Sequence, residues 1–213
     1  MKKIYTAVKF CGMRRRLDIE YANECRPDYA GFILSDGFRR SIVMGTFYEL
    51  VTYLDKDIKR VGVFVNEPIE NILNCHYNQE LDVIQLHGNE NEDYIKTLRK
   101  DFSGEIWKAV RAQSPGDIGR EQKKSCDKLL IDSYSEDCVG GTGKRINTEN
   151  VKNANIGKPF FIAGGLDGEN IAEIIRETAP YGVDVSSGIE TEGCKDIDKM
   201  KKIMSILRKE NLR

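Results

Sequence analysis

The stretch that decides the fold is residues 160–188, FFIAGGLDGENIAEIIRETAPYGVDVSSG. It contains two short apolar runs, 160–163 and 182–186, and each leads into a turn rich in glycine or serine. A segment with the apolar period of a helix, 169–178, lies between the two runs. Apolar runs without clean alternation are typical of parallel strands that helices cover, so this stretch predicts a strand–helix–strand unit.

The same alternation continues through the rest of the chain. Strands are predicted at residues 4–10, 29–34, 60–65, 82–87, 105–110, 128–132, 160–163 and 182–186. Helices are predicted between and after them, at residues 18–25, 46–54, 69–78, 92–101, 114–124, 147–153, 169–178 and 196–209. An open doubly wound sheet and a closed (β/α)8 barrel both fit this strict alternation of strands and helices.

The length of the chain bears on both architectures. A (β/α)8 barrel needs at least ~200 residues, and 213 residues leave short loops and no room for a second domain. Because no linker or low-complexity tract divides the sequence, residues 1–213 are predicted to form one domain. No G-x-G-x-x-G follows the first strand, which weakens the dinucleotide-binding interpretation of an open sheet.

Charge and composition argue against several classes of protein. The net charge of −1 lacks the basic surplus of a nucleic-acid-binding protein. No segment reaches the ~20 apolar residues of a membrane span, and no apolar region of ~7–15 residues follows the first charges as in a signal peptide. The cysteines form no C-x-x-C pair, which argues against zinc and favours reduced thiols in the cytosol. We therefore expect a cytoplasmic protein that binds no metal, nucleic acid or membrane.

Three glycine-rich turns predict a site for an anion. The turns at residues 140–144, 164–165 and 186–188 follow the sixth, seventh and eighth predicted strands. Glycine lets the backbone approach a ligand closely and turn its N–H groups toward an anion, although each turn taken alone also reads as an ordinary connection. Barrels of this class commonly bind phosphate after strands seven and eight, so the barrel and the phosphate site support each other.

Four side chains are candidates for the chemistry. If the barrel closes, the eighth strand lies beside the first, and Lys9, Cys11, Asp132 and Asp184 gather at one end. An ammonium such as that of Lys9 lowers the pKa of a nearby thiol, and a carboxyl whose pKa is raised can act as a general acid. The alternatives are a buried small side chain for Cys11 and a structural ion pair for Lys9 with Asp184.

Two further positions stay open on the residues alone. His87 ends the fourth predicted strand, where it either contacts a substrate or caps the strand. Arg39 and Arg40 lie in the loop after the second strand. A loop arginine is usually solvated, but one at this end of a barrel can hold a carboxylate through two hydrogen bonds.

An ordered set of segments resembles the phosphoribosylanthranilate isomerase family. The matching segments are KFCGM at 9–13, VGVFVN at 61–66, QLHGNE at 85–90, GGTGK at 140–144, PFFIAGGL at 159–166 and GVDVSSGIE at 182–190. The resemblance implies a (β/α)8 barrel that acts in tryptophan biosynthesis. It implies an Amadori rearrangement of N-(5-phosphoribosyl)anthranilate to 1-(2-carboxyphenylamino)-1-deoxyribulose 5-phosphate, without a cofactor.

The resemblance also implies roles for individual residues. The general base of the family falls on Cys11, its general acid on Asp132, and the arginine that holds the anthranilate carboxylate on Arg40. Asp184 is counted with the substrate-binding residues. The phosphate site uses backbone groups of the last loops, which here belong to Gly141, Gly164, Gly165, Ser187 and Gly188. Phe38 stands where the family usually has serine, which leaves Arg39 as an alternative to Arg40.

Two other functions compete with this one. A ribosyl-phosphate isomerase for an aminoimidazole substrate typically uses two aspartates, and Cys11 in the first position argues against it. A phosphate-binding barrel without catalysis has only the changed loop around Phe38 in its favour. For each of these functions we expect a small phosphorylated ligand. We also expect the protein to be a monomer or a homodimer.

Overall fold

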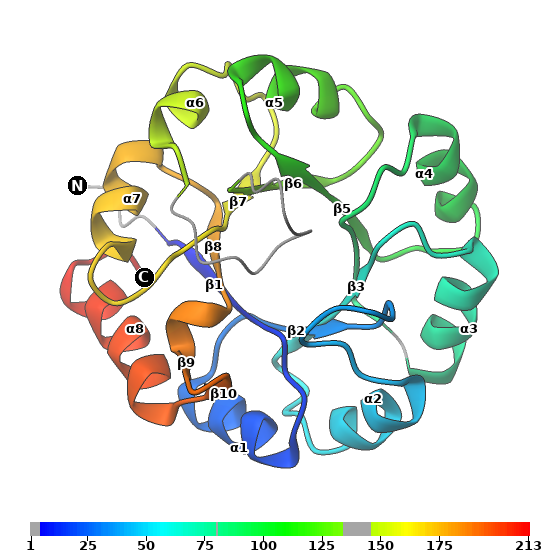
Figure 1. Cartoon of the computed structure of the whole chain (residues 1–213), viewed down its shortest axis with the longest axis horizontal. Helices are drawn as coiled ribbons and strands as arrows, with labels where there is room; N and C mark the ends of the chain where they lie inside the picture. Colours follow the sequence, from blue (N-terminus) through cyan, green and yellow to red (C-terminus); the bar gives the residue numbers. More distant parts are fainter. Residues whose placement is uncertain (1–4, 80, 134–145) are drawn as a thin grey trace.

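Eight parallel strands close into a barrel in the computed structural model, which describes residues 5–79, 81–133 and 146–213. In chain order the strands are β1 (Ala7–Cys11), β2 (Tyr29–Ile33), β3 (Lys59–Phe64), β4 (Val83–Leu86), β5 (Glu105–Arg111), β6 (Lys128–Asp132), β7 (Phe160–Ile162) and β8 (Gly182–Val185). Each strand pairs with the next, and β8 pairs with β1 (Figure 1). The prediction of a (β/α)8 barrel is therefore confirmed, and the open sheet is excluded.

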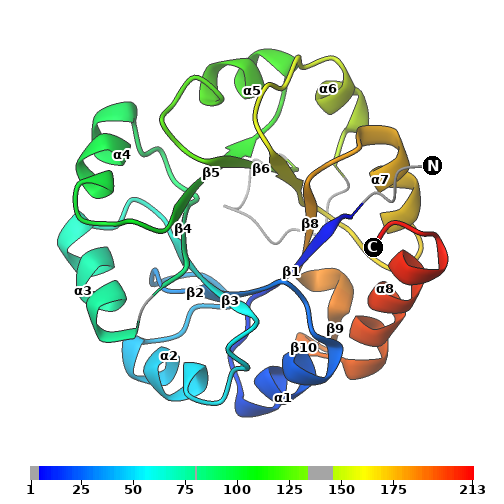
Figure 2. The same ribbon diagram turned by 180° about the vertical axis from the view of Figure 1, so that it is seen from behind.

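The helices form a ring outside the strands, as both views along the barrel show (Figures 1 and 2). They are α1 (Arg16–Cys25), α2 (Met44–Val51), α3 (Ile69–Gln79), α4 (Glu92–Arg99), α5 (Pro115–Glu121), α6 (Thr148–Lys152), α7 (Ile171–Thr178) and α8 (Ile197–Lys209). In α8 the apolar side chains recur at helical spacing, and Met200, Ile203 and Leu207 are buried against the barrel. The parallel sheet is thus covered by helices on its outer face.

The inside of the barrel is filled by its own side chains. Trp107 stacks on Phe161 with their ring centroids 4.4 Å apart, and Tyr29 meets Trp107 edge-on at 4.9 Å. All three lie toward the amino-terminal ends of their strands, since Trp107 pairs with Lys128 at the start of β6 and Phe161 with Gly182 at the start of β8. These aromatic rings form the base of the interior, below the carboxyl ends of the strands.

Short elements after β8 depart from the simple alternation. A 3-10 turn, η1 (Ser187–Ile189), leads into a two-stranded antiparallel hairpin of β9 (Glu190–Thr191) and β10 (Cys194–Lys195). The sequence did not predict them, because strands of two residues are too short for a periodic signal. The hairpin lies beside α1 and α8 in Figure 1. It becomes important because Glu190 and Lys195 are both buried.

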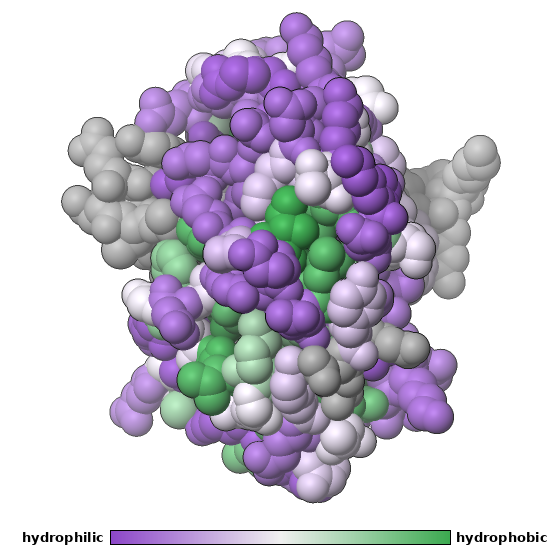
Figure 3. Space-filling model, turned by 90° about the vertical axis from the view of Figure 1, so that its right-hand side faces the viewer, coloured by the Kyte–Doolittle hydropathy of each residue, from purple (hydrophilic) through white to green (hydrophobic). Residues whose placement is uncertain are grey.

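The face over α3 and α4 is largely hydrophilic, with a smaller hydrophobic strip near its centre (Figure 3). Among the described residues, no helix has the length and apolar character needed to cross a membrane.

Candidate active site

The candidate site lies at the carboxyl ends of the strands, where side chains of alternate residues face the barrel interior. Inward-facing Ala7 and Cys11 of β1 pack in one interior cluster with Trp107 and Ala109 of β5 and Leu130 of β6. The same alternation turns the last residues of these strands inward. Cys11, Arg111 and Asp132 therefore face the barrel mouth together with His87, which directly follows β4.

Lys9 and Asp184 form a buried ion pair beside Cys11. Lys9 pairs with Asp184 in the β1–β8 register, and its Nζ lies 3.0 Å from Asp184 Oδ1. Lys9 is fully buried and Asp184 nearly so. The absence of a side chain at Gly31 makes room for this group, because a Cβ there would lie 2.8 Å from Cys11 Sγ and 2.9 Å from Lys9 Nζ. The thiol and the ammonium are thus neighbours, as the sequence predicted.

Burial dominates the ionisation of this group. It raises the pKa of Cys11 above its ordinary value, and the nearby Lys9 ammonium opposes the rise without cancelling it. Lys9 lowers the pKa of Cys11, as expected, but the desolvation of a thiolate by burial is the larger effect, so the net pKa is raised. Burial also lowers the pKa of Lys9, but Asp184 and Cys11 outweigh burial and the pKa stands above its usual value. Lys9 is accordingly charged.

Asp132 lies across the mouth, at the end of β6. Its carboxyl is buried, and Oδ1 accepts a hydrogen bond of 2.8 Å from the backbone N–H of Ser133. Oδ2 lies 3.4 Å from Nε2 of His87. On its other side the ring of His87 contacts Gln85, whose Nε2 lies 3.1 Å from Nδ1. The structure therefore places Asp132 and His87 together at the mouth.

Arg40 is held by a residue that the sequence analysis missed. Its Nε and an Nη each donate a 2.7 Å hydrogen bond to the carboxylate of Glu190, which also accepts one of 2.9 Å from Lys195. Burial raises the pKa of Glu190, but Arg40 and Lys195 outweigh it and hold the pKa at about 2. Arg39 is exposed and lies 3.5 Å from the same carboxylate. A Cβ on Gly12 would lie 2.6 Å from Arg40 Cδ, so Arg40 passes next to the end of β1.

Arg111 is a second cation of the mouth that the sequence analysis did not single out. It ends β5 and pairs in register with Asp132. Within the described residues it forms no ion pair, and its side chain is half-buried. Counting alternate residues from the buried Trp107 would have found it, since residues 107, 109 and 111 share the inward face.

Two of the three predicted phosphate loops, those after β7 and β8, meet through their backbones. Gly164 and Gly165 have positive φ angles of 95° and 63°, which favour glycine. Their turn is held by Asn170, whose Nδ2 donates a 2.8 Å hydrogen bond to Gly165 O. A Cβ on Gly188 would lie 1.9 Å from the carbonyl oxygen of Leu166, so the loops after β7 and β8 touch. Ser187 begins η1 at the same place.

Part of the predicted site cannot be placed. The turn at 140–144, with the predicted phosphate contact Gly141, lies outside the described residues. Among the residues that are described, no group of three His, Cys, Asp or Glu side chains has the geometry to hold a metal ion.

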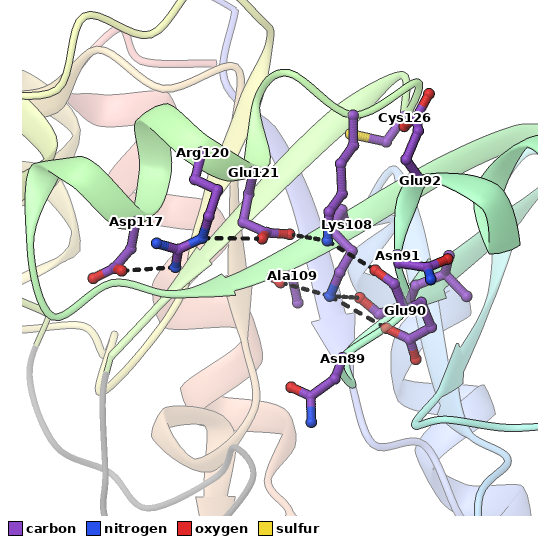
Figure 4. A network of polar contacts seen from close by, with 12 residues as sticks. Asn89, Glu90, Asn91, Glu92, Lys108, Ala109, Asp117, Arg120, Glu121 and Cys126 are labelled. Carbon is purple, nitrogen blue, oxygen red and sulfur yellow. Dashed lines mark hydrogen bonds and ion pairs between the residues drawn. The ribbon is translucent and has the colours of Figure 1, made fainter.

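A polar network on the outer side of β5 supports the loop that follows β4 (Figure 4). Lys108 Nζ is buried 3.2 Å from Glu90 Oε2 and donates a 2.7 Å hydrogen bond to Gly88 O. Glu90 in turn accepts hydrogen bonds from the backbone N–H groups of Gly88 and Asn66. A cavity of about 520 Å³ adjoins this network and extends to Asp117 in α5. The backbone of Gly88, directly after His87, is thereby held by Glu90 and Lys108.

Comparisons of the sequence with known proteins agree on one family. Residues 8–205 match the sequence model of the family described as N-(5'phosphoribosyl)anthranilate (PRA) isomerase. A protein of Thermoanaerobacter sp. (strain X514), named N-(5'-phosphoribosyl)anthranilate isomerase, is 45% identical over 201 residues, which cover 94% of this chain and 97% of that protein. A protein of the same name from Clostridium acetobutylicum is 42% identical over 204 residues, or 95% and 98% of the two chains.

Solved structures give the same result. Phosphoribosyl anthranilate isomerase from Thermus thermophilus superposes with a TM-score of 0.86 at 27% identity, covering 96% of this chain and 99% of that one. A phosphoribosyl anthranilate isomerase in complex with reduced 1-(o-carboxyphenylamino)-1-deoxyribulose 5-phosphate superposes with a TM-score of 0.81 at 26% identity, with the same coverage.

Proposed function

Because the chain belongs to the N-(5'-phosphoribosyl)anthranilate isomerase family, we propose that it isomerises N-(5'-phosphoribosyl)anthranilate to 1-(2-carboxyphenylamino)-1-deoxyribulose 5-phosphate in tryptophan biosynthesis. The observation that carries this proposal is the position of a thiol and a carboxyl, Cys11 and Asp132, at the mouth of one barrel. The two groups come from β1 and β6, with the loops of the predicted phosphate site between them in the strand order. A base, an acid and an anion site are what an Amadori rearrangement of a phosphorylated sugar requires.

The reaction begins with opening of the ribose ring. The phosphate is anchored by backbone N–H groups of the last loops, near Gly164, Gly165, Ser187 and Gly188. Asp132 gives its proton to the ring oxygen as the bond between that oxygen and C1 breaks. The lone pair of the anthranilate nitrogen forms the C1=N bond, which leaves a protonated Schiff base and an Asp132 carboxylate.

Proton removal from C2 follows. The Cys11 thiolate takes this proton, and the electron pair of the C–H bond forms the C1=C2 bond and neutralises the nitrogen. The enolamine becomes the aminoketose when C1 gains a proton and the C2 hydroxyl loses one. Since burial raises the pKa of Cys11, the thiolate depends on the charged Lys9 beside it, which Asp184 holds in place.

An arginine of the loop after β2 binds the carboxylate of the anthranilate ring. The proposed ligand is Arg40, whose guanidinium is already oriented by Glu190, and Arg39 is the alternative on the same loop. Replacing each arginine with methionine separates the two, because loss of the carboxylate ligand raises KM while kcat changes little.

The proposal includes a cytoplasmic location and assembly as a monomer or a homodimer. Cys11, Cys25, Cys75, Cys126 and Cys194 are free thiols, which favours the reducing cytoplasm. One relative, from Thermotoga maritima, is described as dimeric. Sedimentation velocity distinguishes a monomer from a homodimer for this chain.

The proposal is tested by replacing the acid and the base. Cys11→Ser and Asp132→Asn should each lower kcat by about 10²–10⁴-fold with little change in KM, because each removes one proton transfer. Cys194→Ser and Asp198→Asn are matched controls, since Cys194 lies in β10 and Asp198 is exposed on α8. Both controls should keep the parental kcat.

Complementation of a growth defect tests the activity itself. The parent chain should restore growth to a tryptophan auxotroph that lacks this isomerase, and the Cys11 and Asp132 variants should not. A folded parent chain that fails to support growth overturns the proposed function. A Cys11→Ser or Asp132→Asn variant with near-parental kcat overturns the role given to that residue.

A further inference from the structure

His87 is a buried group at the mouth to which the proposed mechanism gives no role. Its side chain is about one-tenth exposed, and its Nε2 lies 3.4 Å from Asp132 Oδ2. Nε2 forms no hydrogen bond with the described residues, although it is shielded from solvent. A buried polar atom without a partner costs free energy, so its position next to the general acid calls for an explanation.

With the Gln85 amide oriented as in the structure, its N–H group faces one ring nitrogen of His87. The Gln85 Nε2 amide lies 3.1 Å from Nδ1, and an amide N–H can only donate. In this orientation Nδ1 accepts, which leaves Nε2 as the ring nitrogen that carries a proton. Gln85 is itself buried on the inward face of β4, two residues before His87. The ring thus presents an N–H group to Asp132.

The two oxygens of Asp132 have different partners. Oδ1 already accepts the backbone N–H of Ser133 at 2.8 Å, whereas Oδ2 faces the Nε2–H of His87 at 3.4 Å. That distance is about 0.5 Å longer than an ordinary N–H···O hydrogen bond. Catalytic hydrogen bonds are often long in a free enzyme and shorten in the complex with substrate.

We infer that His87 is a positioning residue for the general acid: its Nε2–H binds Asp132 Oδ2 as the carboxylate forms. In this step the proton of Asp132 moves to the ribose ring oxygen, and the electron pair of the O–H bond stays on Oδ2. His87 gives up no proton in this step. Its hydrogen bond is stronger to the carboxylate than to the carboxylic acid, so it favours the transition state. The inference rests on the proposed role of Asp132.

The backbone around His87 is rigid enough for this purpose. Its own N–H donates a 2.7 Å hydrogen bond to Phe64 O on β3. The next residue, Gly88, donates its N–H to Glu90 and accepts a hydrogen bond from Lys108 through its carbonyl. A ring whose backbone is fixed on both sides loses little freedom when it binds Asp132.

Kinetics of two His87 variants test the role. His87→Leu removes the donor and should lower kcat by about 10–150-fold. His87→Gln keeps an N–H group near the Nε2 position and should recover a large part of that loss. Affinity for reduced 1-(o-carboxyphenylamino)-1-deoxyribulose 5-phosphate should change less than threefold in both variants. A parental kcat in His87→Leu, or tenfold weaker binding of this analogue, overturns the inference, because weaker binding means direct contact with the ligand.

The tautomer is measured independently of activity. The chain has two histidines, so His76→Gln leaves His87 as the single imidazole in a ¹⁵N spectrum and also serves as the kinetic control. We expect protonated Nε2 and unprotonated Nδ1 at neutral pH, with this preference lost in Gln85→Leu. A proton on Nδ1 overturns the inference. An inactive parent with the expected tautomer instead refutes the proposed function, so the two failures are distinguishable.

Discussion

Removing the charge of Asp184 should destabilise the barrel strongly. Asp184→Asn keeps the shape of the side chain but leaves the Lys9 ammonium buried without its counter-ion. Breaking a buried ion pair in this way costs about 3–5 kcal/mol. For a chain of this size each kcal/mol lowers Tm by about 2–4 °C, so the melting temperature should fall by about 6–20 °C.

Trp107 provides the assay. It is the only tryptophan of the chain and is fully buried inside the barrel, so its fluorescence reports unfolding of the interior. The double variant Lys9→Met with Asp184→Leu should recover most of the lost Tm, because no buried charge then remains. A Tm of Asp184→Asn within about 2 °C of the parent refutes the reasoning, since less than ~1 kcal/mol would then depend on the pair.

Two further predictions concern the loops of the mouth. Because the pKa of Glu190 is held at about 2, below the 4.5 of the free side chain, its ion pairs contribute stability above pH ~5 that is lost as the pH falls toward 2. Urea unfolding should therefore show Glu190→Gln well below the parent at pH 7, with a difference that shrinks toward pH 2; a difference constant with pH contradicts this. Gly188→Ala should lower Tm and raise KM, because its Cβ would collide with Leu166 O, whereas Gly45→Ala meets nothing within 4 Å and should stabilise α2 by about 0.5–1 kcal/mol. Equal Tm values for the two alanine variants would contradict the close approach of the loops.

The sequence predicts those parts of the structure that follow from the repeated periods of strands and helices. Alternating apolar runs and helical periods predict parallel strands covered by helices, and closure of β8 on β1 brings Lys9 beside Asp184. The alternation of side chains along β1 places Cys11 on the same face as Lys9, which the space at Gly31 bears out. These relations need only the period of a strand and the order of the strands.

Contacts between irregular segments are not predictable in this way. Glu190 is 150 residues from Arg40 and lies in a hairpin of two-residue strands, so no period indicates their pairing. The pKa of Cys11 also depends on burial, which outweighs the charge of Lys9. The spacing of residues in a strand predicts which side chain lies beside a thiol. It does not predict how far the fold removes that thiol from water, and therefore not its pKa.

The stacked rings of Trp107 and Phe161, with the edge-on ring of Tyr29, fill the base of the barrel. Within the part of the chain that the structure describes, substrate and product therefore share the entrance at the carboxyl ends of the strands. A product molecule has to leave before the next substrate enters, so the two compete for the same empty enzyme. Product inhibition is then purely competitive, and the rate of turnover includes an exit step through the opening that admits the substrate.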